Sequence, residues 1–417
     1  MKLKQLNALG TFKNGLNFSK ETAQGKGCKI LGVGDFGNNV YVSTKDLEEI
    51  SDEYVKEDDL IHDNDIIFVR SNGNKALVGR VLLAKNIQEN ICFSGFCIRF
   101  RPDSSIVDPE FLFYMLKSAY CKKQYTPSQQ TNITNLSQDR LGAVFVPLLE
   151  NPDVENEYVK ILSLIDRRIE MNQMVTSELE TMVKTIYDYW FVQFDFPDEN
   201  GKPYNASGGK MVWNDVLKSD VPIGWKVRPL SDLMNVYTDG VNPQNMGDQL
   251  VEHYSIPAYD ENRYPAFEKG SSIESGKYRV YTDAILVSKL NPQFKRIWDP
   301  ICVTQEPICS TEFLVCRPTD KGLRTYLFSV LNSDGYYGFM VKNATSSTGS
   351  RKRIKPDVAL TYQLCVPERK IIGQFTQQVS PMIDKMKSLI IQNQELKELR
   401  DWLLPMLMNG QATIGYC

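Results

Sequence analysis

Short apolar runs along the chain predict two sets of β-strands that repeat at a separation of about 216 to 221 residues. In the first half, Asn64–Ser71 (NDIIFVRS) precedes Ser94–Pro102 (SGFCIRFRP), and in the second half Thr282–Lys289 (TDAILVSK) precedes Ser310–Pro318 (STEFLVCRP). These runs are rich in β-branched and aromatic residues, which favour strands. Self-similarity at one separation predicts two copies of one domain.

Each copy continues with a helix rich in aromatic residues and leucine, at Phe111–Tyr120 in the first half and at Tyr326–Ser333 in the second. A polar loop of small residues follows each helix. The loops Thr126–Thr134 (TPSQQTNIT) and Asn343–Ile354 (NATSSTGSRKRI) differ in sequence but match in placement, and both lead to a strand that ends in Val-Pro.

A long helix is predicted after each Val-Pro pair. The first has Asn151 as its N-cap and Pro152 at the first helical position, and we expect it to extend to about Phe191. Apolar residues recur in steps of four and three, which is typical of a coiled coil. The expected seam positions are Val154, Tyr158, Ile161, Ile165, Val175, Leu179, Met182, Ile186 and Tyr189 in the first helix, and Ile372, Phe375, Val379, Met382, Met386, Leu389, Leu396, Leu403 and Leu407 in the second.

Polar residues and one proline interrupt these seams. Arg168 and Asn172 break the first, and Asn393 and Arg400 break the second. Buried polar residues can fix the register of a coiled coil, but helical drift can also carry such residues to the surface, and both interpretations are open. Pro381 predicts a kink or a restart of the second helix.

These elements predict an α+β protein with two pseudo-symmetric α/β domains separated by long antiparallel coiled-coil helices. We expect the first domain at residues 1–150, a central helix and connector at 151–225, the second domain at 226–370 and a distal helix region at 371–417. Symmetry of this kind suits two copies of a partner or a ligand with two similar halves.

Composition narrows the function classes. The 417 residues are 42% hydrophobic, and no apolar run has the length of a secretory signal or a membrane span, so we expect a cytoplasmic protein without a membrane partner. The two histidines, His62 and His253, lie in no recognisable motif, so neither a metal site nor a catalytic triad is expected.

The net charge of −3 argues at first against a DNA-binding protein. The excess acid, however, lies in residues 151–225, which carry 7 basic and 13 acidic side chains. Residues 1–150 are neutral, and residues 226–370 carry a net charge of +3. Neither repeated domain is therefore acidic.

Two motifs resemble parts of catalytic proteins. The glycines of Gly32–Gly37 satisfy GxGxxG, but the following residues read as a turn and a second strand, whereas a phosphate-binding loop requires a helix start there. Asn291–Phe294 (NPQF) differs by one residue from an Asn-Pro-Pro-Phe motif of amino-methylating DNA methyltransferases. We interpret it as a loop of a recognition domain, and we expect no cofactor.

The segment Trp190–Trp225 (WFVQFDFPDENGKPYNASGGKMVWNDVLKSDVPIGW) closely resembles the central region of specificity subunits of type I restriction-modification systems. In that family a WFVDFDFP-like start, GKPY, SGGKMVW and IPxGW recur in this order. Glu398–Ala412 resembles the distal region of the family, and Gly10–Phe18 resembles its start. The sequence departs from the family at Gln193, where aspartate is frequent, and at Pro381.

The resemblance implies a non-catalytic DNA-reading subunit. Each repeated domain would be a target recognition domain that reads one half of a split DNA sequence, and the helices would set the gap between the half-sites. Two methyltransferase subunits that modify adenine N6 would dock on the chain, and motor-nuclease subunits would join them to cleave unmodified DNA. Methylation requires the adenine to be flipped into a pocket of the partner.

Side chains that read base edges or contact phosphates are Arg, Lys, Asn, Gln, Ser and Thr. The candidates in the first domain are Arg70, Asn72, Lys75, Gln129, Gln130, Thr131 and Asn132, and those in the second are Lys289, Lys295, Arg296, Ser347, Thr348, Ser350, Arg351, Lys352 and Arg353. Because the two loops differ, we expect unlike half-sites. Because phosphate neutralisation dominates affinity, the modest charge predicts weak DNA binding without the methyltransferase partners.

Two other functions are open on the sequence. The glycine run and the NPQF segment would fit a self-sufficient methyltransferase or a fused restriction enzyme, which would bind a cofactor. The heptads would fit a coiled-coil scaffold that binds only proteins and retains no DNA.

Overall fold

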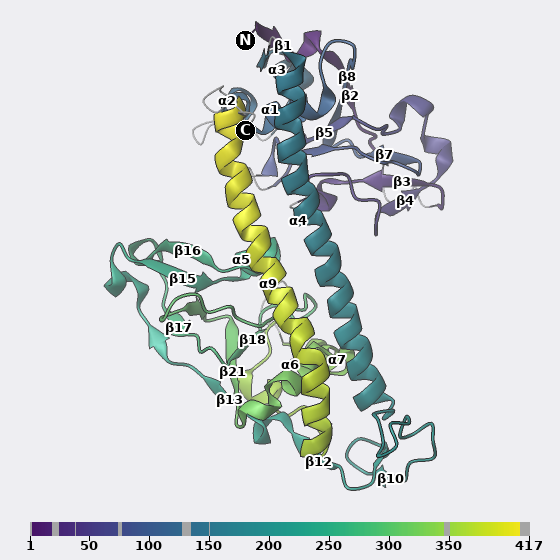
Figure 1. The fold of residues 1–417 in the computed structure, drawn as a ribbon, viewed down its shortest axis with the longest axis vertical. Coiled ribbons are helices and arrows are strands. Elements are labelled where there is room, and N and C mark those ends of the chain that lie inside the picture. Colours follow the sequence, from purple (N-terminus) through teal and green to yellow (C-terminus); the bar gives the residue numbers. More distant parts are fainter. Residues whose placement is uncertain are drawn as a thin grey trace. The chain divides into compact units, whose positions relative to one another are not determined.

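The computed structural model describes residues 2–18, 25–37, 39–73, 77–126, 135–149, 151–345 and 351–408. The chain divides into two compact units. The first consists of Met1–Ile169 with Glu395–Cys417, and the second of Glu170–Gln394. Figure 1 labels the elements of both.

The first unit combines small β-sheets with short helices. A four-stranded antiparallel sheet has the order β2-β8-β5-β6, a three-stranded sheet has the order β4-β3-β7 with β3 parallel to β7, and β1 pairs with β9. The strands are β1 (Lys2–Gln5), β2 (Gly10–Asn14), β3 (Cys28–Leu31), β4 (Glu48–Ile50), β5 (Ile66–Val69), β6 (Val81–Leu83), β7 (Ile91–Phe93), β8 (Cys97–Pro102) and β9 (Phe145–Leu148), and the short helices are α1 (Pro109–Lys117), α2 (Ala119–Tyr125) and α3 (Gln138–Gly142).

The second unit repeats this topology. Its four-stranded sheet has the order β13-β21-β18-β19, β12 pairs with β22, and β16-β15-β20 matches β4-β3-β7, including the parallel pair β15 and β20. Two further strands, β17 and β14, extend the last sheet. The strands are β12 (Lys226–Pro229), β13 (Met234–Tyr237), β14 (Gly240–Val241), β15 (Leu250–Tyr254), β16 (Ala266–Lys269), β17 (Lys277–Arg279), β18 (Ile285–Ser288), β19 (Ile297–Trp298), β20 (Ile308–Ser310), β21 (Phe313–Pro318) and β22 (Gln363–Val366), and the short helices are α5 (Ile256–Asn262), α6 (Arg324–Asn332), α7 (Asp334–Asn343) and α8 (Pro356–Ala359).

The predicted α+β class and the two similar domains are therefore confirmed. In each domain the central strand, β5 or β18, is completely buried, because one face packs on a helix and the other on the smaller sheet. An ion pair recurs beside it. Asp65 accepts two hydrogen bonds of 2.8 Å from Arg101, and Asp283 accepts bonds of 2.8 and 3.0 Å from Arg317. Burial alone would raise the pKa of Asp283, but Arg317 holds it below its usual value.

The second unit also contains a connector after the first long helix. A hairpin of β10 (Met211–Asn214) and β11 (Ser219–Pro222) follows a turn of π-helix at Asp188–Val192. The π-helical turn packs its aromatic side chains into the core of the second unit, where the ring centroids of Trp190 and Phe375 are 5.8 Å apart.

The two long helices are α4 (Pro152–Tyr187) and α9 (Arg369–Met408), drawn in teal and yellow in Figure 1. As predicted, Asn151 caps α4, since its Oδ1 accepts the N–H of Asp153 (3.0 Å). The predicted restart of α9 is wrong, because the helix continues through Pro381. Pro381 is exposed, so water can reach the carbonyl group that loses its helical partner there.

Each unit contains a segment of both long helices, and in the second unit these segments are antiparallel. Asn172 lies beside Asn393, and Trp190, in the π-helical turn that follows α4, packs against Phe375. Val183 and Tyr187 are buried against this part of α9. The predicted antiparallel packing is thus present within this unit.

Polar residues in the seam are paired. Asn172, which is 2% exposed, donates hydrogen bonds of 2.8 Å to the side chains of Gln392 and Asn393. In the first unit the Asp166 carboxylate is fully buried, and it accepts hydrogen bonds of 2.8 Å from Arg400 and from Tyr114 of α1. Asn172, Asn393 and Arg400 therefore stay in the seam.

For Arg168 the opposite interpretation holds, because the structure places it on the surface. The expected seam positions Val175, Met182 and Tyr189 are also wrong, since all three are exposed. The heptad does not restart after Asn172 but continues in phase through it to Val183.

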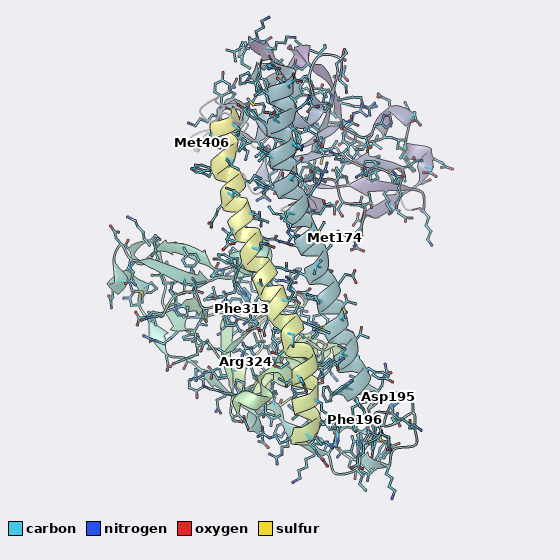
Figure 2. The ribbon with its side chains drawn as sticks, in the orientation of Figure 1. Met174, Asp195, Phe196, Phe313, Arg324 and Met406 are labelled. Carbon is cyan, nitrogen blue, oxygen red and sulfur yellow. The ribbon has the colours of Figure 1, made fainter. Side chains whose placement is uncertain are left out.

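Two of the misassigned positions, Val175 and Met182, belong to an apolar stripe on another side of α4. The stripe consists of five exposed side chains, those of Leu164, Met171, Met174, Val175 and Met182. Met174, labelled in Figure 2, is 60% exposed. We call these five residues the α4 stripe.

The GxGxxG segment forms no phosphate-binding loop. It contains one turn of 3₁₀-helix at Val33–Asp35, and Tyr41 then forms an isolated bridge with Leu83 in place of the expected second strand. None of the described helices combines the length and apolar character that crossing a bilayer requires.

The asparagine pair generates a stability prediction. Asn172→Leu leaves the buried Asn393 without this partner, so we expect the free energy of unfolding to fall by about 1–3 kcal/mol. Replacing both residues with leucine removes both polar groups and should restore stability, while additional oligomeric states appear because the register is less restricted. Chemical denaturation and light scattering measure these effects.

Gln173→Leu, on an exposed neighbouring position, is the matched control and should leave both measurements unchanged. A single Asn172→Leu variant as stable as the unmodified chain would show that the pair does not contribute.

Candidate nucleic-acid interface

The residues that follow the first polar loop lie at the end of β5, where the backbone of Arg70 holds two segments. The N–H of Arg70 donates to the carbonyl of Phe96 (2.8 Å), and its carbonyl accepts the N–H of Leu136 (2.8 Å). One residue further, Ser71 forms a β-bridge with Asn135. The end of the central strand, a turn and the residues directly after the loop therefore meet.

The second polar loop is anchored in the same way at the end of β18. The N–H of Lys289 donates to the carbonyl of Glu312 (2.9 Å), and its carbonyl accepts the N–H of Ile354 (3.1 Å). Leu290 forms a β-bridge with Arg353. The candidates Arg70 and Lys289 thus occupy equivalent positions.

The turns that contact these residues are equivalent as well. The N–H of Phe96 donates to Ser94 Oγ (3.3 Å), and the N–H of Glu312 donates to Ser310 Oγ (3.2 Å). One backbone framework therefore presents different side chains in the two domains.

Basic residues gather around the framework of the second domain. Arg353 donates hydrogen bonds of 3.1 and 2.7 Å to the two carboxylate oxygens of Glu312, and these bonds hold the pKa of Glu312 below its usual value. Arg351 and Lys352 are exposed beside it. The side chain of Asn291 accepts the N–H of Lys352 (3.0 Å), so the NPQF segment supports the loop.

The side chains of two other candidates in the second domain are hydrogen-bonded to groups of the same chain. Arg296 donates hydrogen bonds of 2.6 and 2.7 Å to Asp260, and its guanidinium lies 5.1 Å from the ring centroid of Phe294. Lys295 hydrogen-bonds to the carbonyl of Asn332, and burial lowers its pKa. These contacts stabilise the loop between β18 and β19.

Among the remaining candidates, the structure describes Arg70 and Asn72. The side chains of Arg70 and Asn72 are partly buried. The other candidates lie outside the described residues: Lys75, Gln129, Gln130, Thr131, Asn132, Ser347, Thr348 and Ser350.

Sequence reasoning missed two exposed residues that the first framework presents, Phe96 and Asn135. For Phe96 a signal was available, because the repeated segments align Ser94-Gly-Phe with Ser310-Thr-Glu. For Asn135 the signal is weak, since only the β-bridge shows that it matches Arg353.

Comparisons with known proteins show which proteins this chain is similar to. Residues 1–181 match the family described as the type I restriction modification DNA specificity domain. The chain is 24% identical to the Type I restriction enzyme HindI specificity subunit of Haemophilus influenzae, in an alignment covering 92% of this chain and 94% of that protein. It is also 24% identical to the Type I restriction enzyme MjaIX specificity subunit of Methanocaldococcus jannaschii, with 82% of this chain and 77% of that protein covered.

A solved structure shares the fold. The S subunit of a type I restriction-modification system from M. genitalium has a TM-score of 0.55 and 14% sequence identity, and the alignment covers 100% of this chain and 96% of that one. At this identity the likeness concerns the fold alone. Together with the sequence matches, it shows that residues 1–181 carry a type I restriction modification DNA specificity domain and that the chain is similar, along most of its length, to specificity subunits of type I restriction-modification systems.

Proposed function

We propose that the chain reads an asymmetric DNA target in two parts, with one domain on each half-site. The observation that carries this proposal is the repeated backbone framework, which anchors the residues directly after a polar loop at the end of β5 and the C-terminal end of a polar loop at the end of β18. Because the framework is the same and the side chains differ, each domain would present its own set of donors and acceptors to base edges.

In the second domain, Arg353 is the strongest candidate for a base contact. Glu312 holds two of its donors, which orients the guanidinium while further N–H groups stay available. An oriented Arg suits the O6 and N7 acceptors of guanine. Arg351 and Lys352, which are exposed, suit phosphates.

The other candidates fit supporting roles to different degrees. Arg70 and Lys289 lie at the centre of each framework, where a basic side chain could reach a phosphate. Lys295 and Arg296 are engaged with Asn332 and Asp260, and we assign them to support of the loop. α4 and α9, which contribute residues to both units, would set the separation of the half-sites.

The partners in this proposal are double-stranded DNA, two methyltransferase subunits and motor-nuclease subunits. The two domains together carry little positive charge, so the partners would supply much of the phosphate neutralisation that affinity needs. The complex would act on DNA in the cytoplasm, and adenine would be methylated in a pocket of the partner.

The α4 stripe is the surface we assign to a methyltransferase subunit. Its five apolar residues repeat along one side of the helix at spacings that match a second helix. A contiguous exposed apolar surface of this kind is typical of a protein interface. The occupant would be an amphipathic helix of the methyltransferase subunit.

The target can be mapped by methylation. Co-expression of the chain with its neighbouring methyltransferase subunit, in a host without adenine methylation of its own, should methylate adenine in one motif of two specified segments separated by a fixed number of unspecified bases. Genome-wide mapping of N6-methyladenine measures this. Expression of the methyltransferase subunit alone is the control and should produce no such motif.

Three results would contradict the proposal. They are a single continuous motif, methylation that does not require the chain, and binding of the methyl-donor cofactor by the isolated chain. The last result would favour a self-sufficient methyltransferase.

The Arg353–Glu312 pair should act on one half-site only. Glu312→Gln and Arg353→Ala should both weaken discrimination at the same base position by about 1–3 kcal/mol. Arg353→Ala removes the base contact, and Glu312→Gln removes the carboxylate that orients the guanidinium. The other half-site should stay unchanged. Methylation kinetics on duplexes with single base changes measure the effect.

Asp260→Asn is the matched control, because it breaks a similar bidentate ion pair with Arg296 in the same domain. If this variant shifts recognition as strongly as Glu312→Gln, the assignment to Arg353 is wrong.

The α4 stripe makes a prediction about assembly. Met171→Glu combined with Met174→Glu would place two charges in the interface, so we expect the affinity for the methyltransferase subunit to fall at least tenfold, about 1.4 kcal/mol or more. Titration calorimetry or co-purification measures this. Ser177→Glu, exposed on another side of α4, should assemble normally. Equal assembly of all variants would locate the interface elsewhere.

A further inference from the structure

A phenylalanine occupies an exposed position of the first framework. Phe96 lies in the turn between β7 and β8 and is 61% exposed, whereas Phe93 and Phe100 in the adjoining strands are buried. Single exposed apolar residues are common and need no special explanation. The position of this one, however, is closely defined.

Backbone contacts hold the Phe96 turn beside the end of the polar loop. The carbonyl of Phe96 accepts the N–H groups of Arg70 (2.8 Å) and Ser71 (3.3 Å). Ser71 in turn bridges Asn135, which is exposed. Phe96 and Asn135 are therefore presented by the same framework, on either side of the end of β5.

The second domain has a charged pair at these two positions. Glu312 is equivalent to Phe96 and Arg353 is equivalent to Asn135, because the backbone hydrogen bonds and β-bridges correspond. In that domain the two side chains form a bidentate ion pair, and in the first domain an apolar ring and an amide replace it. These two positions thus carry the largest chemical difference between the frameworks.

The chemistry of the first pair suits an A·T base pair. A phenyl ring offers no hydrogen bond, and the apolar group that a base pair presents in the major groove is the C5-methyl of thymine. The amide of Asn135 has the donor and acceptor that match N7 and N6 of adenine.

We infer that Phe96 determines specificity in the half-site of the first domain, by packing on a thymine methyl group beside an adenine contact of Asn135. This inference rests on the proposed function, and it adds a residue and a base to it. Burial of one methyl group in such a contact changes binding about fourfold.

The test uses the full chain assembled with its methyltransferase subunit, on duplexes that carry the mapped motif. Each thymine of both half-sites is replaced in turn by deoxyuridine, which removes only the methyl group. For the unmodified complex, one replacement in one half-site should weaken binding about fourfold. The Phe96→Ala complex should bind the duplex with all its thymines more weakly than the unmodified complex, by a similar factor. For this variant, deoxyuridine at the sensitive position should not weaken binding further.

Two variants serve as references. Phe96→Leu keeps an apolar side chain and should retain part of the sensitivity to the methyl group. Phe145→Ala, at an exposed position (44%) on β9 of the same unit, should behave like the unmodified chain in every duplex.

The inference is overturned if no deoxyuridine weakens binding, or if Phe96→Ala loses the same factor on that duplex as the unmodified chain. A ring inserted between base steps instead of packed on a methyl group would produce the first result. In both cases the bipartite motif persists, so the proposed function survives. A chain that directs no sequence-specific methylation would overturn both.

Discussion

The backbone of a single residue at the end of each central strand is the constraint on which the candidate nucleic-acid interface depends. Arg70 and Lys289 each donate one hydrogen bond to a turn and accept one from a residue at or just after the C-terminal end of a polar loop. Neither bond uses a side chain, so the side chains of the turn and the loop can change while the framework stays in place. This explains how two domains of one chain can share a topology and still present different chemistry.

The framework needs a rigid base, and the buried strands provide it. β5 and β18 are enclosed on both faces, and the ion pairs Asp65–Arg101 and Asp283–Arg317 join each of them to the neighbouring strand of its sheet. The long helices are restrained by a second set of polar contacts, in which Asn172 meets Asn393 and Asp166 meets Arg400. Buried polar groups of this kind specify register, since any shift leaves them unpaired.

Much of the fold could be predicted from the sequence, because the strongest signals were periodic. The repeated motifs predicted two similar domains, and the heptads predicted two long helices. The error after Asn172 has a physical cause: the prediction treats a buried asparagine as a break in the seam, although its amide is satisfied across the seam. Pro381 was misleading because a proline on the exposed side of a helix removes one hydrogen bond without ending the helix.

The candidate site was less predictable, because residue type does not reveal partners. Arg296 and Arg353 look alike in sequence, yet one is held by Asp260 outside the framework and the other by Glu312 within it. The anchoring of the loops leaves no side-chain signal, so Asn135 could not be singled out. Phe96 was overlooked because apolar residues are expected to be buried.

Duplication of one domain tests the central claim most directly. The register of β1 with β9 matches that of β12 with β22, so Lys2–Leu148 can be replaced by a second copy of Lys226–Val366. If each domain reads one half-site on a common framework, the variant with two copies of the second domain will direct methylation to an inverted repeat of the second half-site. Retention of the original asymmetric motif, or a continuous one, would contradict the account.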